Sequence, residues 1–476
     1  MRFQRGITTL VLAVSLSGCV SDYAQNIQKY QQEFATGSYV EAAASAAALV
    51  AQSTPQDAVV LELQLASAQR LSGDVKGSIA TFESAEKRFS SYDEAPEISM
   101  SGETLSAFSN PYELPYRGRS LDRIMAATYQ ALNYLELSDV EKARVAMNRA
   151  LFRQEDARRI AAQKASLALA ERAAASRTSS DVDKASSSPD VVAALASSRA
   201  VAVTYQDYLN PFSVWLHGIF FLHTAEGASD LEKARNSLSR VGAMTGSNPF
   251  IKEDLELAGA GASRPDRPGA TFVYVVHESG RAPQWSEKKV SFPLILADQN
   301  APIITVAFPR IAPVANRSKL EIGWAGGAKA YPVALADMDS IVGREFDDEL
   351  PVVRTRAITS ATVKGVAAYM ANKAAEENNR RNNTGGSGML YLATLIVSNS
   401  YTTLSAQADL RNWTSLPKEV SMARLVAPRG SSLRLSDPAA PLPVDVTLPP
   451  VKAVLILCKT PADGGPLSVR KIILNK

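Results

Sequence analysis

Cysteine and histidine are scarce in this chain of 476 residues, which has only Cys19 and Cys458 and three histidines. So few thiols exclude a disulfide framework. His217 and His223 are six residues apart in a predicted helix, which puts them on different faces and argues against a shared metal ion. Lys plus Arg (51) and Asp plus Glu (48) nearly cancel, so we expect no nucleic-acid partner. We also expect no cofactor and no metal.

Catalytic signatures are lacking as well. The sequence has no G-x-S-x-G, P-loop or dinucleotide glycine pattern. Ser286 with Lys289 and Ser415 with Lys418 both spell S-x-x-K, the signature of penicillin-binding enzymes. The first pair leads into a predicted strand, and Pro417 breaks the helix that the second would need. A pair of hydrolytic carboxylates far apart in the sequence stays an open alternative.

The N-terminus carries the most specific motif of the chain. Arg2 and Arg5 precede an apolar run from Ile7 to Leu16, and the run ends in Leu16-Ser17-Gly18-Cys19. A charged start, a short apolar segment and small residues before a cysteine are typical of a bacterial lipoprotein signal, in which the thiol carries the lipid. We therefore expect cleavage after residue 18, diacylglyceryl and palmitate-type acylation at Cys19, and anchoring without a membrane span. Val20 in place of Asp favours the outer membrane, facing the periplasm.

The first half of the mature chain has helical periodicity, from about Tyr23 to Leu257. Four segments combine a small or acidic turn residue with a helix start. Gly37 and Gly73 are 36 residues apart, close to the tetratricopeptide period of about 34. We predict a degenerate tetratricopeptide-like array, with an irregular helical bundle as the alternative. The four segments begin at Gly37, Gly73, Ser138 and Ser229.

Two insertions interrupt the predicted array. Residues 90–120 are rich in Pro, Tyr, Ser and Gly and predict a surface loop. Residues 153–205 predict a long helical arm that folds back on itself at a mobile, Ser-rich tip. Gly and Pro punctuate residues 259–269, which we predict to be the linker between two domains.

Beyond the linker the apolar period changes to two, which indicates short strands and a β-sandwich-like domain over 270–476. A helical insertion is expected over 337–409, with Val363, Val366, Met370 and Ala374 on one face of its main helix. The fold class is thus α+β, with a signal at 1–18, a helical domain at 19–258 and a strand-rich domain after the linker. The predicted strands are 271–277, 289–296, 303–308, 320–324, 330–336, 420–425, 432–435, 451–458 and 468–474.

Several stretches give the chain a family resemblance: 110–119, 128–135, 141–145 and the sequence DLRNWTSLP at 409–417. Together with Cys19 and its flanks they resemble a family of bacterial outer-membrane lipoproteins. The resemblance implies a tetratricopeptide-like N-terminal half and a shared envelope assembly with lipoproteins similar to the curli secretion channel. It supplies no catalytic residues.

Two groups of residues are candidates for partner contact. The aromatic loop offers Tyr112, Tyr116 and Arg117, since Tyr and Arg contribute strongly at interfaces. Arg149 and Arg153 lie in a basic helix that could bind an acidic partner in the groove of a repeat array. The alternatives are that the rings pack on their own array and that the arginines are solvated.

These observations favour a non-enzymatic scaffold or adaptor in an envelope assembly or secretion complex, held to the outer membrane by lipid on Cys19. The expected partners are envelope proteins, among them lipoproteins similar to the curli channel. The alternative is a cell-envelope hydrolase that acts on peptidoglycan or exported polysaccharide.

Overall fold

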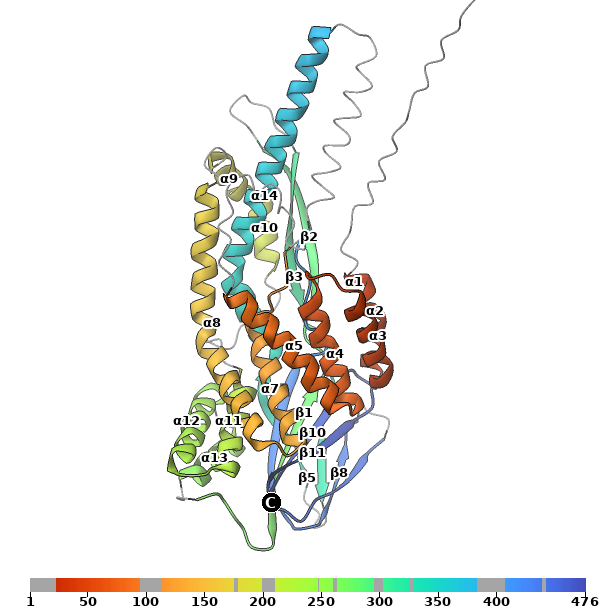
Figure 1. Ribbon diagram of the computed structural model, residues 1–476, viewed down its shortest axis with the longest axis vertical. Coiled ribbons are helices and arrows are strands. Elements are labelled where there is room, and N and C mark those ends of the chain that lie inside the picture. Colours follow the sequence, from red (N-terminus) through yellow and green to blue (C-terminus); the bar gives the residue numbers. More distant parts are fainter. Residues whose placement is uncertain are drawn as a thin grey trace, which may run out of the picture.

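The computed structural model is an α+β protein with a helical array followed by β-sheets (Figure 1). It describes residues 23–94, 114–174, 179–198, 210–246, 248–259, 263–294, 303–324, 329–382, 407–438 and 442–476. Helices fill the first half and strands dominate the second, which confirms the predicted fold class at that level.

Consecutive helices of the array pack side by side as hairpins. The apolar periodicity of the sequence is the physical reason, because each helix must bury one stripe against a neighbour. The helices are α1 (Tyr23–Asn26), α2 (Gln28–Ala35), α3 (Tyr39–Gln52), α4 (Ala58–Ser72), α5 (Val75–Glu94), α7 (Ser120–Glu136), α8 (Val140–Ala174), α11 (Pro211–Thr224), α12 (Ala228–Thr245) and α13 (Pro249–Gly259).

The predicted turn motifs lie between helices. Gly37, Gly73 and Ser138 have φ of 78°, 99° and 60°, the left-handed conformation that ends a helix and reverses the chain. The fourth turn comes slightly earlier than predicted, because Gly227 caps α12 and Asp230 lies in its first turn. Local turn chemistry therefore placed three of the four helix boundaries correctly.

The strands form three sheets. The main sheet has the order β11-β10-β1-β7-β6, a second sheet has the order β5-β4-β8-β9, and β2 and β3 form a two-stranded ribbon. Strand β1 runs parallel to β10 and antiparallel to β7. Each predicted strand has a counterpart, but the strand predicted over 330–336 is divided into β5 and β6, which belong to different sheets, and β9 was not predicted. The strands are β1 (Ala270–Ser279), β2 (Gln284–Pro293), β3 (Ile303–Ala312), β4 (Glu321–Trp324), β5 (Lys329–Ala330), β6 (Val333–Asp337), β7 (Glu419–Pro428), β8 (Ser432–Ser436), β9 (Val444–Thr447), β10 (Ala453–Thr460) and β11 (Ser468–Asn475).

The main sheet has two buried faces. Along β1, Val273 and Val275 pack with residues of the second sheet such as Leu435, which makes the sandwich-like half. Phe272 and Tyr274 point the other way and share one core with the helices. The helical and strand-rich parts that the sequence separates at 259–269 are therefore joined through a common apolar core.

The predicted arm is part of a larger projection, which Figure 1 shows above the array. The projection consists of the distal part of α8, α9 (Ser179–Ser186), α10 (Pro189–Ser198), α14 (Met338–Asn382), β2 and β3. Val182 and Ala185 of α9 are buried against the β2–β3 ribbon and α14. Residues 179–186 of the predicted tip therefore form a helix that packs on the rest of the projection, whereas their mobility stays a prediction.

Helix α14 confirms the helical insertion from Met338 to Asn382, whereas residues 383–406 lie outside the described part of the chain. Its buried face differs from the prediction. Ile358 and Thr362 are fully buried, but Met370 is 58% exposed. The buried residues of α14 differ from the predicted face because this helix packs against two elements, α8 and β3.

Gly37 offers a test of how the array and the sheet fit together. A Cβ at this position would come within 2.2 Å of Pro466, in the turn between β10 and β11. We expect Gly37→Ala to lower the free energy of unfolding by about 1–2 kcal/mol for the backbone and by more for the clash. Gly430→Ala is the matched control, since φ is 75° there and no atom lies within 4 Å of a Cβ. Equal losses in urea unfolding would contradict this account.

Candidate functional site

The residues of the motif DLRNWTSLP thread between the helices and the main sheet. We call residues 408–418 the strap. The amide of Lys418 donates to the carbonyl of Ser279 at 2.9 Å, and the carbonyl of Leu416 accepts from Ala282 at 2.8 Å. The strap is thus fixed to the end of β1 and to the connection that follows it.

Trp413 holds the strap in the helical array. The side chain is 1% exposed, and its ring packs against Phe82 and Tyr129 at 5.9 and 5.8 Å between centroids. Its indole N–H lies 2.8 Å from both Ser67 Oγ and Ser415 Oγ. Truncating a buried tryptophan costs about 3–5 kcal/mol, so this one side chain is a large part of what joins strap and helices.

Arg411 is buried beside two carboxylates. Its guanidinium lies 2.8 Å from Asp409 and 3.3 Å from Asp57, and it also donates to the carbonyl of Gln56 at 2.8 Å. Burial raises the pKa of Asp57 although Arg411 opposes this, and the neighbouring carboxylates raise the pKa of Arg411. Asp409 is the nearer carboxylate and the principal counterion of Arg411. The guanidinium therefore stabilises the fold and is not available to a ligand.

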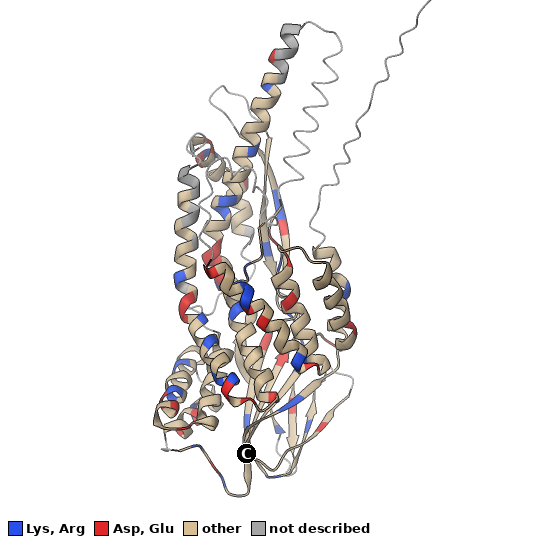
Figure 2. Cartoon of the chain, viewed as in Figure 1, with Lys and Arg blue, Asp and Glu red and all other residues tan. Residues whose placement is uncertain are grey.

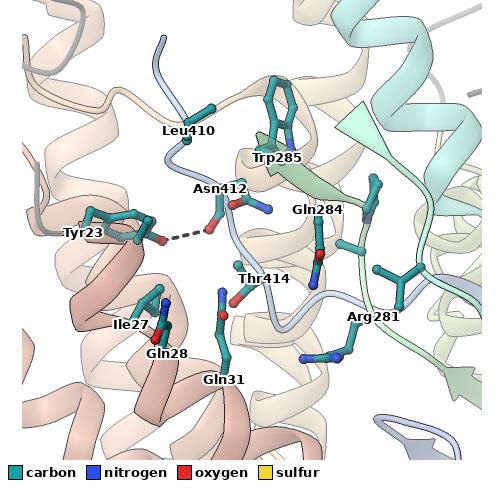
Figure 3. A pocket seen from close by; sticks show the side chains of 14 residues that line it. Tyr23, Ile27, Gln28, Gln31, Arg281, Gln284, Trp285, Leu410, Asn412 and Thr414 are labelled. Carbon is teal, nitrogen blue, oxygen red and sulfur yellow. Dashed lines mark hydrogen bonds between the residues drawn. The ribbon is translucent and has the colours of Figure 1, made fainter. Parts of the chain in front are cut away.

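A cleft of about 220 Å³ opens where the strap meets α1, α2 and the β1–β2 connection (Figure 3). Tyr23 closes one side, and its hydroxyl donates to the carbonyl of Asn412 at 3.0 Å. Apolar and polar side chains are mixed along the walls. The lining residues are Tyr23, Ala24, Ile27, Gln28, Gln31, Arg281, Ala282, Pro283, Gln284, Trp285, Val314, Leu410, Asn412 and Thr414.

Arg281 is the only charged residue among those described as lining the cleft. Burial lowers the pKa of its guanidinium, and none of the described lining residues carries a carboxylate. The neighbouring amides of Gln28, Gln31 and Gln284 offer further N–H donors. The cleft therefore has the donor chemistry of a small anion site. Sequence reasoning missed it, because its walls come from segments far apart in the chain.

The predicted contact residues do not form one surface. Tyr116 is buried, and its hydroxyl donates to Asp122, which corrects the prediction that its ring meets a partner. Arg117 is exposed and its guanidinium lies 5.9 Å from the ring of Tyr92. Cys19 and Tyr112 lie outside the described residues. The ring of Tyr116 thus packs within the protein, as the alternative to partner contact predicts.

The two candidate arginines of the basic helix α8 lie close to acidic side chains of the protein itself. Arg153 is 9% exposed and pairs with Glu86 at 2.8 Å and Asp93 at 2.9 Å, so it is not available to a partner. Arg149 is a third exposed and lies 3.8 Å from Glu86. Acidic and basic residues are mixed along α8 and its neighbours (Figure 2). The prediction of a basic groove is wrong for Arg153, whose charge belongs to the contact between α8 and α5.

The three histidines are buried. His217 lies 2.9 Å from Ser237 Oγ, and His223 Nε2 lies 2.9 Å from the hydroxyl of Tyr274. Burial lowers the pKa of His217 to about 4 and that of His223 to about 3. Both rings are therefore neutral parts of the core. Across the described ranges, no three His, Cys, Asp or Glu side chains gather as metal ligands would.

His277 lies near Ser318 and Asp437 but not in the geometry of a catalytic triad. Nε2 lies 3.4 Å from Ser318 Oγ and 3.9 Å from Asp437, so serine and acid face the same ring nitrogen. A triad needs the acid on the other nitrogen. The ring is 1% exposed, and burial lowers its pKa to about 4. The grouping is a buried hydrogen-bond cluster.

The S-x-x-K serines and Cys458 also have structural roles. Ser286 lies in β2, and Ser415 Oγ donates to Gln64 at 3.0 Å inside the core. Lys418 pairs with Asp339. Cys458 is 1% exposed, and burial raises the pKa of its thiol, which confirms its expected role as a small core residue.

No family model matches the chain, and no curated protein is similar to it. One solved structure, a tetratricopeptide repeat protein from Parabacteroides merdae, matches 50% of this chain and 99% of its own at 15% identity. Its TM-score of 0.15 is too low to carry any argument. Among the described helices, none has the length and apolarity needed to cross a membrane.

The buried histidines predict a loss of stability in acid. Unfolded His223 has a pKa near 6.5 and the folded residue one of about 3, so its stabilising effect is full above pH 6.5 and declines as pH falls. In urea unfolding, the stability difference between the native protein and His223→Gln should shrink by about 2 kcal/mol from pH 7.5 to pH 5. A difference that stays constant over this range would show that His223 takes up a proton in the folded state.

Proposed function

We propose that this chain is a lipoprotein of the outer membrane that faces the periplasm and acts as a non-enzymatic scaffold or adaptor. The observation that carries the proposal is the sequence Leu16-Ser17-Gly18-Cys19, followed after three residues by Tyr23, the first residue of α1. Tyr23 is 5% exposed, so a buried residue of the helical array lies only four positions after Cys19. So short a separation along the chain keeps the body at the membrane surface.

Exposed apolar side chains on α8 support the role of a scaffold. Val145 is 58% exposed and Phe152 is 61% exposed. They are seven residues apart, which places them on one face of the helix about 10 Å apart. Exposed apolar side chains on one helix face can contribute to a contact surface. Arg149 lies between them on the same face and adds a partly exposed charge.

The helix hairpins and their turns support a tetratricopeptide-like array, although the helices deviate from a regular repeat where α8 extends into the projection. The sequence resemblance supplies the class of partner: envelope lipoproteins similar to the curli secretion channel. An adaptor of this kind would hold its partner on α8 while the acyl chains hold the complex at the membrane.

Acylation can be tested at the two cysteines. We expect Cys19→Ser to lose labelling by radioactive palmitate completely, because the thioether and the new N-terminus both depend on this residue. Cys458→Ser is the matched control and should be labelled like the native protein, since Cys458 is buried in β10. Labelling that survives Cys19→Ser, or that disappears in Cys458→Ser alone, would refute the anchor.

The partner can be tested by photo-cross-linking in intact cells. A photoreactive residue at Phe152 should cross-link a ring-forming envelope lipoprotein, and Val145→Ser should reduce the yield several-fold by removing apolar contact area. Leu442, which is 74% exposed and lies before β9, is the control position. The same products from both positions would contradict a specific surface on α8.

A further inference from the structure

The cleft lies at the start of the described part of the chain. Tyr23 and Ala24 both line it, and they are the first two residues of α1. Only residues 20–22 separate Tyr23 from Cys19. Four steps of 3.8 Å between Cα atoms span about 15 Å at most. The proposed acyl anchor therefore brings the mouth of the cleft close to the phospholipid headgroups.

The chemistry of the cleft suits a headgroup phosphate. Arg281 provides a guanidinium, which binds phosphate oxygens through paired N–H donors. The described lining has no Asp or Glu to neutralise it. Amide groups of Gln28 and Gln31 lie on the α2 side as further donors. The ligand that this arrangement favours is a small anion with polar substituents.

The other wall of the cleft is apolar and aromatic. Trp285 lines it beside Pro283 and Leu410, and tryptophan is enriched where protein meets the headgroup layer. Arg119 stacks on the ring of Trp285, with its guanidinium 3.7 Å from the ring centroid. The carboxylates of Asp122, Glu349 and Asp409 lie near Arg119 and offset its charge, so Arg281 is the cation that the cleft presents to an anion.

We propose that the cleft binds the phosphate headgroup of an anionic phospholipid and so orients the body with α1 and α2 against the membrane. This inference rests on the proposed acylation of Cys19. The acyl chains supply most of the affinity, and the cleft supplies the orientation. The membrane is thereby the source of the anion, in preference to a free phosphate ester.

The experiment uses the full mature protein in nanodiscs of phosphatidylglycerol that contain a lipid with a nitroxide on its headgroup. Lys29→Cys carries a fluorophore next to the cleft, since the side chain of Lys29 is 77% exposed. The buried Cys458 does not compete for the label. Arg281→Gln should reduce quenching of the fluorophore at least twofold. Arg434→Gln, which removes an exposed charge from β8, should leave quenching unchanged.

Equal quenching in the native protein and in Arg281→Gln would overturn the inference. Calorimetric binding of glycerol 3-phosphate that requires Arg281, without any Arg281-dependent quenching, would also overturn it by assigning the cleft to a soluble anion. The intact mass of the same sample reports acylation independently. An acylated protein without Arg281-dependent quenching overturns only this inference, whereas an unacylated protein overturns the proposed function as well.

Discussion

The insertion of Trp413 and Arg411 between the helices and the main sheet is the interaction on which the rest of the structure depends. Both side chains are 1% exposed, and both belong to the strap rather than to a helix or a strand. Irregular backbone is stable at such depth only where its polar groups find partners. Gln64 supplies several: its side-chain amide donates to the carbonyl of Asn412 at 3.0 Å and its side-chain oxygen accepts from Ser415 at 3.0 Å. The array and the sheet are thereby held in one relative position.

Buried ion pairs add to this constraint because they are costly to break. Lys459 is buried with Glu278 at 3.4 Å and also donates to the carbonyl of Ser415 at 3.2 Å. Such a pair contributes little net stability, but removing one partner leaves an uncompensated charge in the core. Arg424 and Asp254, 3.0 Å apart, repeat the arrangement where α13 meets β7, and burial raises the pKa of Asp254 to about 7. Breaking either pair would leave an unpaired buried group where the strap or α13 meets the sheet.

The strap also lines the cleft. One wall of the cleft consists of Leu410, Asn412 and Thr414, so the second half of the chain completes a cleft whose other wall is formed by the first helices. In the proposed arrangement the cleft lies against the membrane, and the exposed apolar side chains of α8 contact a protein partner. The shared core fixes the angle between the two surfaces, as an adaptor requires. A connection through residues 259–269 alone could not do so.

Local signals in the sequence determined the elements. Glycine at left-handed turns, the short apolar runs of β1 and β10, and helical stripes depend on neighbours a few residues away and can be read without the fold. Strand β9 was missed because prolines at 441, 443, 449 and 450 surround its four residues. Only the tertiary structure decided which charges were free: Arg153 meets Glu86 and Asp93 from 67 and 60 residues away. It also decided that Trp413 fills the array 346 residues from Ser67. Contacts over such separations leave no periodic trace in the sequence, because their geometry exists only once the helices have packed on the sheet.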